Sequence, residues 1–119
     1  MRTQIGRTYK DGNRPNWSLD SGSGTRTADY YIKFERTYRR PPEVIASISG
    51  MDTNHARNAR LTTDVMQVGR EGFVLRFRTW ADTIVYGAGA SWMSVPKVGE
   101  EADDVSIVDV ELDLNGVET

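Results

Sequence analysis

The sequence predicts an all-β protein, an antiparallel β-sandwich of about six to seven strands. Apolar and polar side chains alternate along several segments, as expected where one face of a strand is buried and the other faces water. No segment repeats its apolar residues at helical spacing, and turns rich in glycine, proline and asparagine separate the segments. With 119 residues, the chain is long enough for one hydrophobic core and too short for two.

Residues 1–29 are predicted to be loop and short edge structure belonging to the same domain. They are polar and rich in Gly, Asn, Asp and Ser, and Trp17 is their large apolar anchor. The stretch from Asp20 to Thr25 is typical of turns.

The body of the sandwich is expected in residues 30–95. The predicted strands cover residues 30–35, 43–49, about 60–68, 73–80 and 84–95. The clearest pattern belongs to the fourth strand, in which Phe73, Leu75 and Phe77 share one face. We expect Phe77 and Trp92 to lie in the core.

Five consecutive small residues, 87–91, interrupt the last of these strands. Strands normally avoid such residues, so the pattern indicates close approach there by another sheet, a ligand or a neighbouring protomer.

Residues 96–119 are predicted to be an acidic extension with one further strand, because Val108, Val110, Leu112 and Leu114 alternate with acids. Residues 99–119 carry eight acids and no base, a formal charge of −8, whereas residues 1–98 carry fifteen Lys and Arg and nine acids, a charge of +6. The basic residues are dispersed along the strands, which disfavours nucleic-acid binding and favours solvated faces or pairing with the tail of another protomer.

No catalytic or metal site is predicted. The chain has no cysteine, and its one histidine, His55, lies in a polar segment where a solvated side chain is the ordinary outcome. Serine and aspartate lack a histidine partner, and no Gly-x-Ser-x-Gly motif is present. The acids at Glu100, Glu101, Asp103 and Asp104 lack calcium-loop spacing and are interpreted as a solvated linker. We therefore expect a protein that is not an enzyme and needs no cofactor.

The N-terminus is basic but is followed by no apolar stretch, and no run approaches the ~18 apolar residues of a membrane span. The expectation is a soluble protein without membrane insertion or a recognisable signal peptide. Cytoplasmic, non-classically exported and virion-associated locations all stay open.

Three segments together resemble the H-type lectin domain, the family of snail agglutinins and of the C-terminal domain of discoidins. They are Phe34–Val44, then Ser49–Asp52 with Asn58–Leu61, and Gly72–Trp92. The match spans Phe34 to Val95 in the order and spacing of the family. The resemblance implies a sandwich of about six antiparallel strands that assembles into a trimer, with stacking into a hexamer left open. It also implies that terminal N-acetylgalactosamine or galactose binds near the boundary between protomers.

Carried over by position, the resemblance implies that Arg60, Trp80 and Tyr86 contact the sugar. Arginine can donate two geometrically fixed hydrogen bonds to adjacent hydroxyls, and an aromatic ring packs on the apolar face of a galactose-type sugar. Without the resemblance, the same residues are interpreted as a surface charge, a core tryptophan and a tyrosine at an interface between protomers.

Two positions depart from the family. Snail members have a histidine directly after the site tryptophan, where this chain has Ala81. The family's ligand aspartate lies in an N-terminal loop that is shorter here, so that Asp20 is the nearest carboxylate although Ser23 aligns better by distance from Phe34.

The resulting hypothesis is a lectin made multivalent by trimerisation. The alternative is a structural or assembly component, such as a trimeric fibre or virion protein, that uses the fold for attachment or oligomerisation. The acidic tail favours this alternative slightly.

Overall fold

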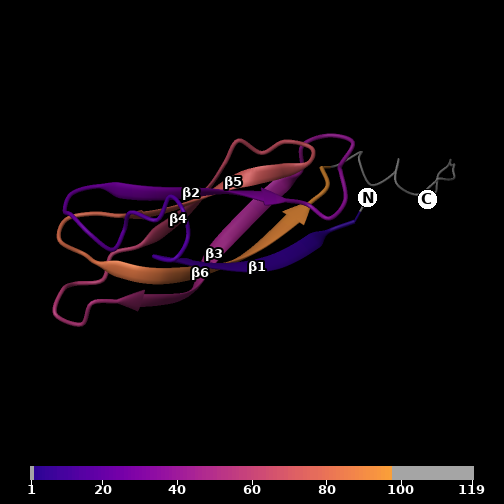
Figure 1. Ribbon diagram of the computed structural model, residues 1–119. Helices are drawn as coiled ribbons and strands as arrows, with labels where there is room; N and C mark the ends of the chain where they lie inside the picture. Colours follow the sequence, from indigo (N-terminus) through magenta and orange to yellow (C-terminus); the bar gives the residue numbers. More distant parts are fainter. Residues whose placement is uncertain (1, 98–119) are drawn as a thin grey trace, which may run out of the picture.

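A computed structural model describes residues 2–97, which form six β-strands (Figure 1). The strands are β1 (Gln4–Asp11), β2 (Arg26–Lys33), β3 (Glu43–Thr53), β4 (Thr62–Met66), β5 (Gly72–Thr79) and β6 (Val85–Val95). The predicted strand from Val108 to Leu114 lies outside the described residues.

The strands form two three-stranded sheets, ordered β1-β6-β3 and β2-β5-β4, in which every pairing is antiparallel. Figure 1 shows the sheets as two layers. The predicted antiparallel β-sandwich is therefore confirmed. No helix occurs between residues 2 and 97, so none of this part of the chain is a helix that could cross a membrane.

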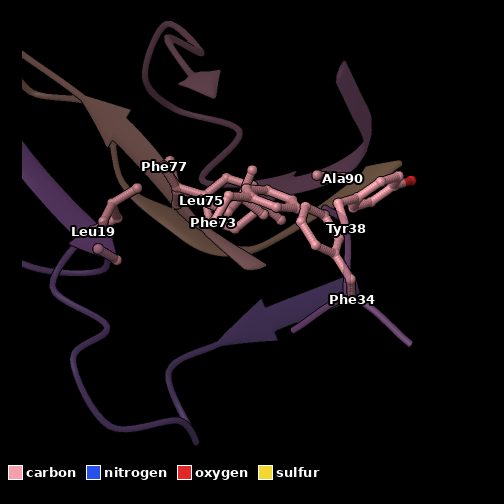
Figure 2. Packing of buried hydrophobic residues seen from close by; sticks show 10 residues of the cluster. Leu19, Phe34, Tyr38, Phe73, Leu75, Phe77 and Ala90 are labelled. Atoms are coloured by element: carbon pink, nitrogen blue, oxygen red, sulfur yellow. The ribbon is translucent and has the colours of Figure 1, made fainter. Parts of the chain in front are cut away.

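The core lies between the layers because each sheet turns alternate side chains inward. Phe73, Leu75 and Phe77 of β5 are fully buried, and so are Ala88 and Ala90 of β6. Figure 2 shows this row of side chains, with Leu19 of the β1–β2 loop near Phe77 and Phe34 and Tyr38 of the β2–β3 connection near the other end. Phe77 is a core residue as predicted, and the half-buried Trp92 packs against the core.

Strand β1 is longer than the short edge structure expected in this region. Its pattern is the reverse of the usual one: Ile5 and Tyr9 are exposed, while the inward positions hold Gly6, Thr8 and Lys10. A strand whose inner face is polar gives little hydrophobic signal, which explains why pattern analysis underestimates it. Within residues 2–97, β1 pairs only with β6 and so forms an edge of its sheet.

The small residues of β6 have two explanations inside the chain itself. Ala88 and Ala90 face the core, where they leave room for the aromatic rings. Gly87 faces outward beneath Tyr9, because a Cβ added there would collide with the tyrosine hydroxyl. At Gly87 the close neighbour is therefore a side chain of the adjacent strand in the same sheet, and not the other sheet, ligand or protomer that the pattern predicts.

Candidate functional site

Three loops meet at one end of the sandwich (Figure 1): residues 12–25, 54–61 and 80–84. We call this end the loop end. Main-chain hydrogen bonds join the loops, since Gly24 N donates to Ala81 O at 2.9 Å and Asn54 N donates to Ile84 O at 3.0 Å. Every site residue predicted from the sequence lies in one of these loops or, for Tyr86, at the start of β6.

Arg60 lies in the loop before β4 and is held from both its ends. Its Nη1 donates to Asp82 Oδ1 at 3.1 Å and to Thr83 Oγ1 at 2.9 Å, and its main-chain oxygen accepts from Thr79 Oγ1 at 2.6 Å. Thr83 is fully buried and in turn donates to Asn58 O at 2.6 Å. With 26% of its side chain exposed, Arg60 is a fixed donor at the loop end and not a free surface charge.

Trp80 is half-buried just after β5 and is not among the residues that pack against the hydrophobic core, which include Trp17 and Trp92. The guanidinium of Arg78 lies 5.1 Å from the centroid of its ring. This arrangement is a cation–π contact, which leaves Trp80 at the surface beside a positive charge.

Ala81 is exposed and has a left-handed backbone, with a φ angle of 59°. Its carbonyl oxygen accepts from Gly24 N and from Arg26 Nη2, each at 2.9 Å. Arg26 also donates through Nε to Gly24 O at 2.9 Å and through Nη1 to Ser21 O at 3.0 Å. Arg26 thus clamps the first loop onto the third, a role that no local pattern in the sequence indicates.

Tyr86 lies apart from Arg60, on the side of the loop end that belongs to the β1-β6-β3 sheet. It is the extra residue of a β-bulge, because Thr53 pairs with Val85 while Asp52 pairs with Gly87. Its side chain is 44% exposed, and its hydroxyl accepts a hydrogen bond from Asn54 Nδ2 at 3.0 Å. No hydrogen bond or ring contact described for residues 2–97 joins Tyr86 to Arg60 or Trp80.

The two candidates in the first loop lie on different sides of the loop end. Asp20 directs its carboxylate toward Gly12, since a Cβ on that glycine would lie 2.7 Å from Oδ2, and Gly12 N donates to Tyr86 O at 3.3 Å. Ser23 lies between Gly22 and Gly24, next to the bond with Ala81. Asp20 therefore lies on the Tyr86 side of the loop end, and Ser23 lies on the Ala81 side.

Sequence reasoning also missed Asp82 and Arg57. Asp82 pairs with Arg60 through its carboxylate, and its main-chain oxygen accepts from Arg57 Nη1 at 3.2 Å. His55, in the same loop as Arg57, is exposed. Within residues 2–97, no group of His, Cys, Asp and Glu has the arrangement needed to hold a metal ion.

Comparison with known proteins identifies the domain. Residues 29–95 match the family model for the H-type lectin domain. The chain is 28% identical over 83 residues to the protein of ATP synthase subunits region ORF 7 from Fuscovulum blasticum, covering 70% of this chain and 72% of that protein. It is also 28% identical over 93 residues to a discoidin-1 polypeptide from Dictyostelium discoideum, covering 77% of this chain and 36% of that polypeptide.

The fold is shared with solved discoidins. Recombinant discoidin II of Dictyostelium discoideum in its native structure superposes with a TM-score of 0.70 at 25% identity, over 79% of this chain and 36% of the discoidin. Wild-type discoidin II gives a TM-score of 0.69 at 26% identity, over 78% and 35% of the two chains. This chain spans about a third of the length of those discoidins.

Proposed function

This chain belongs to the H-type lectin domain family, a family of carbohydrate-binding and in general non-enzymatic domains, and from that premise we propose that it recognises terminal galactose or N-acetylgalactosamine at the loop end. The observation that carries the proposal is the fixed guanidinium of Arg60. Two acceptors, Asp82 and Thr83, hold its Nη1 in place, and its other nitrogens have no hydrogen-bond partner within residues 2–97.

A preorganised guanidinium suits a galactose-type sugar for a geometric reason. Its N–H groups form a rigid planar fork that can reach two neighbouring hydroxyls at once. Because galactose and glucose differ in the direction of one hydroxyl, a donor fixed in space can distinguish them, whereas a mobile one cannot.

Two aromatic rings lie at the same end of the sandwich as this donor, on different sides of that end. Trp80 begins the same loop as Asp82, and Tyr86 stands at the start of β6 with its hydroxyl held by Asn54. Either ring could pack on the apolar face of the sugar. Asp20 on the Tyr86 side and Ser23 on the Ala81 side are the acceptors proposed for the remaining sugar hydroxyls.

We also propose that the domain acts as a trimer through the outer face of the β1-β6-β3 sheet. Ile5 on β1 and Ile45 on β3 are 77% and 62% exposed, and both lie opposite Met93 of β6. Together with Arg7 and Ser91 they line a groove of about 510 Å³. Exposed apolar side chains gathered on one sheet face indicate burial against another protomer, and several linked sites would raise avidity without new sugar contacts.

The direct test is a glycan array probed with the protein and with Arg60→Ala. We expect selective binding to terminal galactose or N-acetylgalactosamine that Arg60→Ala abolishes. Arg36→Ala is the matched control, because Arg36 is an exposed arginine in the β2–β3 connection, at the opposite end of the sandwich. Circular dichroism of each variant verifies folding, and size-exclusion chromatography with light scattering gives the oligomeric state.

The exposed sheet face also favours the alternative function, an assembly component that keeps the fold for oligomerisation. Under that alternative, a folded trimer would bind no glycan on the array, and Ile45→Glu would abolish oligomerisation and partner attachment together. Binding that Arg60→Ala removes would contradict it.

A further inference from the structure

Four guanidinium groups surround the tripeptide Trp80-Ala81-Asp82. Arg78 lies over the ring of residue 80, and Arg26 donates to the carbonyl of residue 81. Arg57 donates to the carbonyl of residue 82, and Arg60 donates to its carboxylate. The four side chains come from three separate parts of the chain, so their convergence is a product of the fold.

The positive charge of this cluster is not balanced by the protein residues it contacts. Asp82 supplies the one carboxylate among those partners within residues 2–97, and Arg60 uses it. Arg26 and Arg57 bond to carbonyl oxygens, and Arg78 faces a ring; such neutral partners orient a guanidinium without cancelling its charge.

Another arginine of the same protein shows what a balanced site looks like. Arg76 binds both oxygens of Asp29, from Nε at 2.7 Å and from Nη2 at 2.8 Å. The side chain of Arg78, two residues farther along the same face of β5, makes no hydrogen bond within residues 2–97. Arg78 therefore lacks the carboxylate partner that neutralises Arg76 on the same face of the strand.

Besides Arg60, two of the four arginines have guanidinium nitrogens without a hydrogen-bond partner within residues 2–97. All three nitrogens of the Arg26 guanidinium already donate to carbonyls, and Arg60 is assigned to the sugar hydroxyls. Arg57 uses Nη1 alone, and Arg78 uses none of its donors. They approach the tripeptide from the β3–β4 loop and from the end of β5.

We propose that the site selects galactosides carrying an oxyanion, in the form of a sulfate ester or a carboxylate, which Arg57 and Arg78 bind beside the sugar. This inference rests on the galactose site proposed above and specifies its ligand class. A planar guanidinium donates two parallel hydrogen bonds to an oxyanion, and such charge-assisted bonds are stronger than neutral ones. Because the cluster is open to water, its contribution should weaken with salt.

The experiment is a titration of the folded protein with four soluble ligands. These are a neutral galactoside, its sulfated form, its sialylated form, and a sulfated glucoside as a probe of charge alone. We expect the sulfated or the sialylated galactoside to bind about tenfold more tightly than the neutral one at low ionic strength, and the advantage to shrink at high ionic strength. The stronger of these two ligands identifies whether sulfate or carboxylate is preferred.

Arg57→Gln and Arg78→Gln should each reduce the ratio of the affinity for the anionic galactoside to the affinity for the neutral one. Lys33→Gln is the control for net charge, because Lys33 is exposed and pairs with Gly72 at the opposite end of β2. It should alter neither affinity.

The possible failures are distinguishable. Equal affinity for neutral and anionic galactosides would overturn this inference and leave the galactose site standing. Equal affinity for the sulfated glucoside and the sulfated galactoside would reduce the cluster to unspecific charge attraction and also overturn it. Binding of none of the four ligands would contradict the galactose site itself, and the inference with it.

Discussion

The two ends of the sandwich are built in opposite ways. At the end opposite the loop end, Phe34, Tyr38, Phe73 and Trp92 form an aromatic cluster, with ring centroids 5.2–5.9 Å apart. At the loop end, arginine and threonine side chains hold the chain through hydrogen bonds to oxygen atoms. Packing is sensitive to every methylene group, whereas exposed hydrogen bonds contribute little net free energy, so stability should depend on the aromatic end and recognition on the loop end.

The buried hydroxyl group of Tyr38, in the aromatic cluster, finds its hydrogen-bond partners within the protein. The Tyr38 hydroxyl donates to Arg2 O at 2.9 Å and lies 2.7 Å from the hydroxyl of Ser94, and both side chains are fully buried. This hydrogen bonding ties the start of the chain and β6 to the β2–β3 connection.

The largest expected effect is on stability, from Phe34→Ala. The substitution leaves a cavity between Tyr38 and Phe73 and should lower the free energy of unfolding by about 3–5 kcal/mol, as measured by urea denaturation. Sugar affinity of the remaining folded protein should be unchanged, and Phe34→Leu should lose less stability. A sugar affinity that falls in parallel with stability would contradict the separation of the two ends.

Thr83→Val tests the loop end with a substitution of similar shape. It removes the acceptor for Arg60 and the donor to Asn58 O, so we expect a loss of about 1–3 kcal/mol in unfolding free energy and a severalfold weaker sugar affinity. Thr37→Val, at an exposed position in the β2–β3 connection, is the control. Unchanged affinity in Thr83→Val would show that Arg60 needs no second anchor.

Ala81→Gly should have a small effect in the opposite direction. The φ angle of 59° disfavours alanine, and glycine removes that cost, so we expect the melting temperature to rise by an amount corresponding to about 0.5–1 kcal/mol. A lower melting temperature would show that the Cβ of Ala81 makes a packing contribution that outweighs the backbone strain.

The smallest effect concerns pH and lies between the two ends, at Asp29 and Arg76. Hydrogen bonds from Arg76 lower the pKa of the Asp29 carboxyl below its ordinary value. A group with a lowered pKa adds stability above its unfolded pKa and loses it as the pH falls through the folded value, so the loss should occur below about pH 4. Asp29→Asn should flatten the acid limb of stability against pH slightly, because both partners are partly exposed. An unchanged acid limb would show that the pair contributes nothing measurable.

Regions formed by a local sequence pattern are more predictable than regions formed by contacts between residues far apart in the sequence. The bounds of β5 are predicted to within a residue or two, because the alternating Phe73, Leu75 and Phe77 mark its buried face within one short segment. Strand β3 continues to Thr53, beyond the predicted Ser49, because its last residues pair with β6, a partner far along the sequence.

The site was predictable only in part for the same reason. The resemblance placed Arg60, Trp80 and Ala81 in loops that the structure brings together, whereas Tyr86 and Asp20 lie on the other side of the loop end. Whether these residues bind sugar stays a prediction. The guanidinium cluster forms because the fold brings Arg26, Arg57 and Arg78 together from separate segments. No periodic pattern in the sequence predicts that arrangement.

The pairing of β1 with β6 has a consequence for how the molecule forms. Gln4 lies opposite Ser94, so β1 finds its partner only when β6, far along the sequence, has emerged from the ribosome. Closing a loop of that length is entropically unfavourable, and folds dominated by such distant pairings acquire their structure slowly. Until then, the exposed Ile5 and Tyr9 and the unpaired backbone of β1 are available to other nascent chains, which makes synthesis the stage at which this protein is most vulnerable to aggregation.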